Sequence, residues 1–291
     1  MKTKTVQKNL IPKSLFICIP FFYKKENLSY LNLTSKHYPS LAEKIFVTVL
    51  TNTSNTKERD SISKILKKNK LAFSIETPKL LGHPYLLPFS SVAIMQKAIK
   101  KNYSHFMMIE DDILFTKKNM IYWMTSYSEI LKNDLNFYPS FVRVEKNCEN
   151  KYVYSDFKTR FFKFLLPKIL INKKLFINLP KAYQGLYLYD KKLLKEYLSS
   201  NACNPDFGKA QIREKANLGL SFYNVKKGFY SRNIHLLKNK NLDDSCFVLH
   251  LRSNASKRMF YKKYFFSKLK LIDSNGFITK AGTVLKEKLF Y

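Results

Sequence analysis

The chain has 291 residues, enough for one large α/β domain, and its 24 Phe and 19 Tyr provide ample material for a hydrophobic core. It carries 52 Lys and Arg against 21 Asp and Glu, so its formal net charge of +31 favours association with a polyanion. The sequence contains no apolar run of about 18 residues that would predict a membrane-spanning helix, and no segment typical of a secretory signal. We therefore expect a cytoplasmic protein.

The first hundred residues alternate apolar, β-branched runs with helical patterns. The expected order is strand 14–23, helix 26–38, strand 44–52, helix 61–68, strand 71–76 and helix 90–101. A fourth apolar run, 106–109, then reads as a strand that is buried on both faces. This alternation predicts a parallel, doubly wound α/β sheet, in which ligands bind at the carboxyl ends of the strands.

Three adjacent carboxylates, Glu110, Asp111 and Asp112, follow the fourth strand directly. Like charges at the end of a buried strand are costly unless a cation or solvent compensates them, and we expect Asp112 to be an exposed ligand at the end of the strand. Mg²⁺ or Mn²⁺ binds one or two carboxylates together with phosphate oxygens and water, a set that a nucleotide diphosphate would complete. The alternative is an acidic turn in which an aspartate caps a helix.

An acidic tripeptide at the end of the fourth strand of such a sheet resembles the Asp-X-Asp motif of the GT-A glycosyltransferases, in its Glu-Asp-Asp form. The resemblance implies a GT-A-like, Rossmann-type mixed and mostly parallel sheet flanked by helices. It also implies transfer of a sugar from a nucleotide-sugar donor. In that arrangement Asp112 binds Mn²⁺ or Mg²⁺, while Glu110 and Asp111 lie on the donor side, with Glu110 nearer the ribose.

A late apolar run, 246–254, places His250, Arg252 and Asn254 at alternating positions on one face of an expected strand. Imidazole is a good ligand for Mn²⁺-like metals, and guanidinium is suited to phosphate oxygens. The GT-A resemblance implies that a late histidine completes the metal site. We therefore predict His250 as a metal ligand, with Arg252 and Asn254 on the donor, while a hydrogen-bonded core histidine remains the alternative.

Residues 210–223 have helical periodicity, and Glu214 lies off the apolar stripe. GT-A enzymes place an acid at the start of a helix in this region, facing the acceptor. Such a carboxylate can take the proton of the acceptor hydroxyl if the reaction inverts configuration. Glu214 and Asp206 are the two candidate catalytic residues. A solvated Glu214 paired with a neighbouring base is the alternative.

Two loops are further candidates for the donor site. The segment 82–88 contains a glycine and two prolines, which predict an irregular loop near the carboxyl edge of the sheet, where His83 and Tyr85 would contact the donor. A rigid connection with an aromatic plug is the alternative. Gln184 precedes an expected strand and would form part of the donor or acceptor wall, an assignment that rests on order in the chain alone.

Basic and aromatic residues interleave in 158–174 and 257–270. Such segments suit an anionic membrane surface, which predicts a peripheral protein at the inner face of a membrane. The alternative is that the aromatic residues belong to the core of a lysine-rich chain. A basic nucleic-acid-binding protein or a metal-dependent nuclease is the rival function, but no nucleic-acid-binding motif is evident and the acids would repel phosphate without a metal.

The predicted organisation is a nucleotide-sugar-binding half, 1–145, an acceptor-binding half of the same domain, 146–255, and a basic C-terminal extension, 256–291. Another strand, 137–145, begins the acceptor half. The predicted function is a metal-dependent, hexosyltransferase-type GT-A enzyme that acts on a glycan or lipid-linked acceptor in surface polysaccharide or lipooligosaccharide synthesis. The sequence leaves the sugar, the nucleotide and the stereochemical outcome open.

Overall fold

The structure, a computed structural model, divides the chain into two compact units, each built from two separate stretches of sequence. Unit 1 comprises Met1–Ile121 and Gln184–Gly219, and unit 2 comprises Tyr122–Tyr183 and Leu220–Tyr291. The structure describes residues 10–79, 84–146, 152–154, 166–180, 185–205, 218–239 and 241–252.

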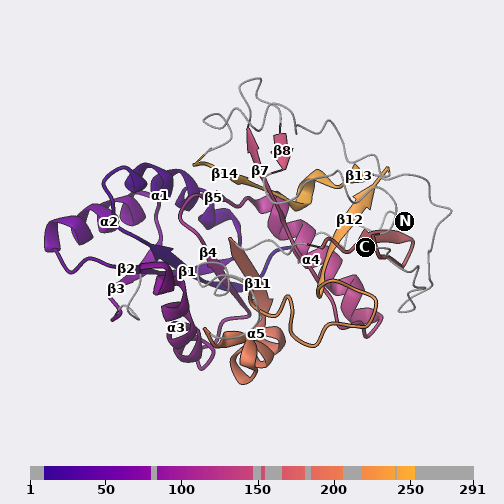
Figure 1. Ribbon diagram of the computed structural model, residues 1–291. Helices are drawn as coiled ribbons and strands as arrows, with labels where there is room; N and C mark the ends of the chain where they lie inside the picture. Colours follow the sequence, from indigo (N-terminus) through magenta and orange to yellow (C-terminus); the bar gives the residue numbers. More distant parts are fainter. Residues whose placement is uncertain are drawn as a thin grey trace, which may run out of the picture. The chain divides into compact units, whose positions relative to one another are not determined.

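A five-stranded sheet forms the centre of unit 1 (Figure 1). Its strands lie in the order β11 (Leu186–Asp190), β4 (His105–Ile109), β1 (Ser14–Phe21), β2 (Lys44–Thr51) and β3 (Ala72–Glu76). The pairs β1–β2, β1–β4 and β2–β3 are parallel, whereas β11 runs antiparallel to β4. The expected mixed, mostly parallel sheet is therefore confirmed.

Helices cover both faces of this sheet. Figure 1 shows α1 (Asn27–Ser35) and α2 (Thr56–Lys68) on one side and α3 (Ser90–Ala98) and α5 (Lys191–Ser199) on the other. Because both faces are covered, the central strands are apolar at nearly every position instead of alternating. Ile17 of β1 and its register partner Met107 of β4 are both fully buried. Each such side chain contributes about 1.5–3 kcal/mol through burial.

Two of the helical segments differ from the expected ones. The helix α2 begins at Thr56, earlier than the expected residue 61, because the Asn55 side chain accepts a hydrogen bond from Glu58 N at 3.3 Å. Residues 84–88 of the expected irregular loop belong to a 3-10 helix, η2 (Pro84–Phe89), whereas residues 82 and 83 lie outside the described residues.

The remaining short elements of unit 1 connect these layers. They are the 3-10 helices η1 (Tyr38–Ser40) and η4 (Asn201–Cys203), the two-residue strand β5 (Ile113–Leu114), and the first residues of α4 (Lys117–Lys132), a helix that continues into unit 2.

Unit 2 contains two smaller groups of strands. One has the order β13 (Asn241–Leu242), β12 (Asn233–Lys238), β10 (Lys174–Ile177) and β9 (Lys168–Ile171), with β6 (Tyr138–Pro139) also paired to β12. The other contains β14 (Phe247–His250), β7 (Val142–Lys146) and β8 (Tyr152–Tyr154).

The expected single strand 137–145 is two strands, because the chain changes its partner between Pro139 and Val142. Ser140 N still donates to Ile234 O of β12 at 3.0 Å, whereas Val142 pairs with Phe247 of β14. Pro139 has no amide hydrogen to offer a neighbouring strand, which suits a position where one ladder ends.

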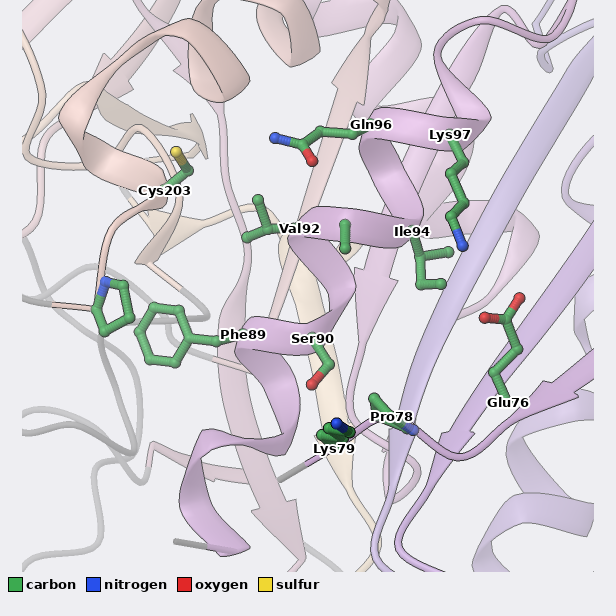
Figure 2. A pocket seen from close by; sticks show the side chains of 12 residues that line it. Glu76, Pro78, Lys79, Phe89, Ser90, Val92, Ile94, Gln96, Lys97 and Cys203 are labelled. Carbon is green, nitrogen blue, oxygen red and sulfur yellow. The ribbon is translucent and has the colours of Figure 1, made fainter. Parts of the chain in front are cut away.

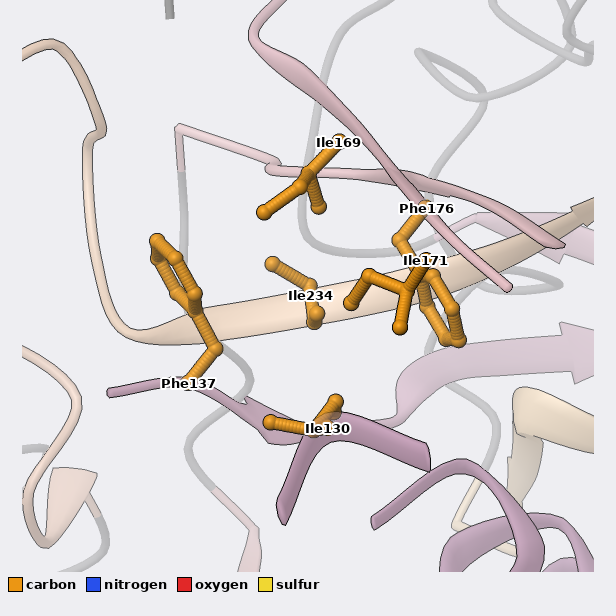
Figure 3. Packing of buried hydrophobic residues seen from close by; sticks show 6 residues of the cluster. All are labelled: Ile130, Phe137, Ile169, Ile171, Phe176 and Ile234. Carbon is orange, nitrogen blue, oxygen red and sulfur yellow. The ribbon is translucent and has the colours of Figure 1, made fainter. Parts of the chain in front are cut away.

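The core of unit 2 gathers apolar side chains from α4, β9, β10 and β12 (Figure 3). Its buried members are Ile130, Phe137, Ile169, Ile171, Phe176 and Ile234. Asn172 and Lys173 connect β9 to β10 with positive φ angles of 47° and 67°, as a tight hairpin turn requires.

This core contains part of the basic segment 158–174. Ile169 and Ile171 of this segment are fully buried inside unit 2. The aromatic residues of the segment, which the core alternative concerns, lie outside the described residues. Residues 155–165 and the second basic segment, 257–270, lie outside the described residues. Among the described helices, none combines the length and the apolar character needed to span a membrane.

Two expectations near the end of the chain are wrong in detail. Of the helix expected over 210–223, Leu218 is helical, whereas Gly219 adopts φ +50° and residues 219–224 form turns and bends. Residues 210–217 lie outside the described residues. A Cβ at Gly219 would lie 2.1 Å from the Tyr189 hydroxyl oxygen, so a side chain has no room there. Cys246 lies in the 3-10 helix η5 (Asp244–Cys246) and not in a strand, and its side chain is buried.

Candidate active site

The three acids form a turn at the carboxyl end of β4. Glu110 N donates to Gly185 O at 3.0 Å, which continues the pairing with β11, and Ile113 N donates to Glu110 O at 3.3 Å, which closes the turn. Glu110 and Asp111 are half-buried, but Asp112 is only 7% exposed. The expectation of an exposed Asp112 is therefore wrong, since the residue is buried in the turn.

The acidic turn is held from α1, a contact that the sequence analysis missed. Thr34 is fully buried, and its Oγ1 lies 3.1 Å from Asp111 O and 3.0 Å from Tyr30 O, so its hydroxyl hydrogen is shared between these carbonyls. Burial raises the pKa of the nearby Tyr38 phenol, and the charge of Asp111 raises this pKa further. The buried hydroxyl of Thr34 thus supports the turn without adding a positive charge.

Polar side chains also tie together the carboxyl ends of the neighbouring strands. Beyond β2, Asn52 Oδ1 accepts from Tyr23 N at 2.5 Å. Arg59 Nη1 donates to Thr77 Oγ1 at 2.8 Å, and this hydroxyl donates to Thr53 O at 2.7 Å. The edge at which a parallel sheet binds ligands is therefore preorganised by hydrogen bonds between segments that are distant in sequence.

A cavity of about 500 Å³ lies along α3 in unit 1 (Figure 2). Its other walls come from the end of β3 and from Cys203 and Pro205. In Figure 2 the side chains of Lys97 and Glu76 point toward each other. None of the predicted site residues that the structure describes lines this cavity, so it does not enter the candidate site.

In unit 2, His250 is paired with a carboxylate that the sequence analysis did not single out. Its Nδ1 lies 3.0 Å from Glu145 Oε1, and the two residues are only 8% and 5% exposed. Leu249 and Val144 are register partners in the parallel pair β14–β7, which sets His250 beside Glu145 at the next position. No local signal could have identified this pair, because 105 positions separate its members in sequence.

The strand β14 ends at His250, whereas the sequence analysis extended it to Asn254. Arg252 lies in a bend, so the expected alternation that placed it on the same face as His250 is wrong. Tyr85 lies in η2, where the backbone alone is described. The other predicted site residues lie outside the described residues: His83, Gln184, Asp206, Glu214 and Asn254.

The donor atoms of the acidic turn fit a divalent ion that is shared with a ligand. In the part of the chain that the structure describes, no group of three or more His, Cys, Asp and Glu side chains gathers as a complete metal cage. Mg²⁺ and Mn²⁺ sites in nucleotide-dependent enzymes need only one or two carboxylates, because phosphate oxygens and water supply the rest. Asp112 offers such a carboxylate at a buried position within a turn that backbone hydrogen bonds of Glu110 and Ile113 close.

Comparisons with known proteins add likenesses of fold. No protein-family profile and no curated protein matches the sequence. Among solved structures, TarS from S. aureus (residues 1–349) is 15% identical with a TM-score of 0.41, covering 71% of this chain and 56% of that one. The same protein in complex with UDP-GlcNAc gives 14% identity and a TM-score of 0.40, covering 82% of this chain and 61% of that one.

The mannosyltransferase PcManGT from Pyrobaculum calidifontis, in complex with GDP-Man and Mn²⁺, is 10% identical with a TM-score of 0.45. This match covers 84% of the present chain and 58% of the mannosyltransferase, so the chain spans less than two thirds of the length of these solved structures. With TM-scores below 0.5, the likenesses carry no argument about activity, which has to come from the residues of this chain.

Proposed function

We propose that this chain is a metal-dependent glycosyltransferase of the GT-A type, which moves a sugar from a nucleotide-sugar donor to a glycan or lipid-linked acceptor. The acidic turn carries this proposal. It follows β4 directly, at the ligand-binding edge of a mostly parallel sheet, and it turns the Asp112 carboxylate inward. An acidic turn that served only to cap a helix would not need three carboxylates.

Asp112 would hold a divalent ion, Mn²⁺ or Mg²⁺, which supplies charge neutralisation for a departing diphosphate. Glu110 and Asp111 would orient the donor, with Glu110 nearer the ribose. Thr34 fixes the backbone at Asp111, so the acids are positioned before the donor arrives. Arg252 is proposed to add positive charge beside the diphosphate.

The remaining assignments are proposals from the sequence. His83, Tyr85, Gln184 and Asn254 are proposed to contact the donor. His250 is proposed as a nitrogen ligand for a divalent cation.

On the acceptor, Glu214 is proposed as the general base, with Asp206 as the second candidate. Glu214→Gln should lower turnover about 10²–10⁴-fold with little change in donor affinity, because the amide keeps the shape but cannot accept the proton. Near-normal turnover of this variant would transfer the assignment to Asp206.

We also propose that the enzyme meets its acceptor at an anionic membrane surface. The extension 256–291 and its basic-aromatic segment suit an anionic membrane surface, which fits a peripheral enzyme of surface polysaccharide or lipooligosaccharide synthesis at the inner face of a membrane. The full chain should sediment with anionic vesicles at low salt and be released at high salt, whereas a chain without 256–291 should remain in the supernatant. Salt-resistant sedimentation of the truncated chain would contradict this proposal.

A thermal-shift screen of nucleoside diphosphates and nucleotide sugars, with and without Mn²⁺, tests the function directly. A ligand at about 100 times its Kd stabilises the folded state by about 2.7 kcal/mol. That corresponds to a rise in Tm of several degrees, since about 1 kcal/mol shifts the Tm of a chain of roughly this size by about 2–4 °C. The rise should require Mn²⁺ and should disappear in Asp112→Asn.

The net charge of +31 favours a second candidate, a nucleic-acid-binding protein, and the same screen separates the two. Stabilisation by an oligonucleotide, combined with no metal-dependent response to any nucleoside diphosphate, would replace the glycosyltransferase proposal with this candidate.

A further inference from the structure

His250 and Glu145 form a buried, hydrogen-bonded pair of side chains in unit 2. Both residues stand at the carboxyl ends of adjacent parallel strands, one position beyond the register pair Leu249–Val144. Register partners in a parallel pair point to the same face of the sheet, so the two side chains meet without any distortion of the strands. Glu145 is a buried carboxylate with 5% exposure, and such a group requires a hydrogen-bonding partner.

The contact bears on which nitrogen of His250 carries the proton. With Glu145 ionised, its carboxylate can only accept a hydrogen bond, and the Nδ1 at 3.0 Å from Glu145 Oε1 then carries the hydrogen. In a neutral imidazole the other nitrogen, Nε2, then holds the lone pair. Metal-binding histidines are typically oriented in this way, with a carboxylate accepting from the ring nitrogen that does not bind the metal.

We propose that Glu145 is the positioning residue for His250: it holds the imidazole in the Nδ1–H tautomer and so presents Nε2 as a ligand for a divalent cation. This inference rests on the proposed function, which makes His250 a metal ligand, and it adds the residue that prepares the ligand. A carboxylate that accepts the Nδ1 hydrogen also makes the imidazole a stronger electron-pair donor toward a metal.

The tautomer can be measured without any metal. The chain has five histidines, so the imidazole ¹⁵N signals of His250 are identified by their loss in His250→Ala. At about pH 9, well above the ordinary histidine pKa of about 6.5, His250 should carry its hydrogen on Nδ1. Glu145→Gln keeps an acceptor oxygen and should retain this tautomer, whereas Glu145→Leu fills similar space without an acceptor and should lose it.

The affinity for Mn²⁺ alone, followed by the electron paramagnetic resonance signal of the free ion, provides the second readout. Loss of a residue that orients a metal ligand typically weakens metal binding by about 10–100-fold. Glu145→Leu should show a loss in this range and Glu145→Gln a smaller one. A residue that merely filled space would leave both the tautomer and the affinity unchanged in Glu145→Leu. If that variant does not fold, wild type and Glu145→Gln still decide the tautomer.

The outcomes separate this inference from the proposed function. An unprotonated Nδ1 in the wild-type protein overturns the inference, as does an Mn²⁺ affinity that falls in His250→Ala but not in folded Glu145→Leu; the proposed function survives both. An affinity that falls in Asp112→Asn but not in His250→Ala removes His250 from the ligands, and the inference fails with it. An affinity unchanged in all of these variants overturns the metal-dependent function itself.

Discussion

The two units differ in how their acidic side chains are brought into position. In unit 1 three carboxylates follow one another in sequence, and the backbone turn at the end of β4 determines where they point. In unit 2 the carboxylate and the imidazole come from separate strands, β7 and β14, and only their parallel register brings them together. The first arrangement concentrates negative charge, whereas the second pairs one carboxylate with one hydrogen-bond donor.

This difference predicts how strongly the loss of each group should affect the binding of a cation. Adjacent carboxylates attract a cation strongly, because their mutual repulsion is relieved when it binds. A neutral imidazole that is already paired contributes one nitrogen and no negative charge of its own. We therefore predict that loss of the Asp112 carboxylate lowers Mn²⁺ affinity more than loss of the His250 imidazole does.

The largest expected effect is that of Asp112→Asn. The amide keeps the size of the side chain but removes its negative charge, so Mn²⁺-dependent binding of a nucleoside diphosphate should fall by more than about 100-fold, equivalent to about 2.7 kcal/mol. Calorimetric titration measures this loss, and Asp60→Asn on the exposed side of α2 serves as a matched control. Unchanged metal dependence in Asp112→Asn would remove the acidic turn from the site.

The second prediction concerns acid stability, in which the two units should behave alike. Burial lowers the pKa of His235 in unit 2 to about 4, and burial lowers that of His105 in unit 1 to about 4 as well. Both folded-state values lie below the unfolded value of about 6.5. The stability that these neutral histidines provide is therefore fully present above about pH 6.5 and is lost as the pH falls toward 4, because the unfolded chain binds more protons there.

Denaturant unfolding across this pH range measures the effect. For His235, which is 1% exposed, the loss should be about 1–3 kcal/mol. His235→Gln should flatten the pH dependence, since the amide can still donate to Phe141 O, the partner of His235 Nε2 at 3.3 Å. A pH profile identical to that of the wild type would assign acid sensitivity to other groups.

The third prediction concerns the proposed metal ligand of unit 2, His250. His250→Ala should weaken Mn²⁺ binding by about tenfold, roughly 1.4 kcal/mol, which is less than the effect of Asp112→Asn, because a neutral ligand contributes less to holding a cation than a carboxylate. His235→Ala is the matched control, since it removes another buried histidine of the same unit and should reduce stability without changing Mn²⁺ affinity. An effect of His250→Ala as large as that of Asp112→Asn would contradict the expectation that a neutral imidazole contributes less to cation binding than a carboxylate.

The smallest expected effect is that of Thr34→Val. The substitution keeps the shape of the side chain but removes the hydroxyl that lies 3.1 Å from Asp111 O, and it should reduce the free energy of unfolding by about 1 kcal/mol. Mn²⁺ affinity should fall by less than about fivefold, because the acids remain and only their support loosens. Chemical unfolding and the metal titration together test whether the contact positions the turn or only stabilises α1.

The order of strands and helices in unit 1 could be predicted because each βα unit carries its own local pattern. Apolar runs predicted the strands β1, β2 and β4, and the parallel order then placed Glu110 at the ligand-binding edge of the sheet. The same reasoning failed for Arg252, because an apolar run does not reveal where a strand of unit 2 ends. The division of the expected strand 137–145 into β6 and β7 could not be predicted either, because a change of pairing partner leaves no pattern in the sequence of the segment.

The sequence by itself determined the apolar cores, the alternation of elements in unit 1 and the three consecutive carboxylates, because these depend on residues that are close together along the chain. Tertiary structure alone decided that Asp112 turns inward, that Thr34 supports the acidic turn, and that Glu145 pairs with His250. Each of these contacts joins segments whose separation in sequence bears no relation to their distance in space. They arise only when strand register and helix packing are complete, because hydrogen bonds act over about 3 Å and local propensity does not encode which distant segment comes that close.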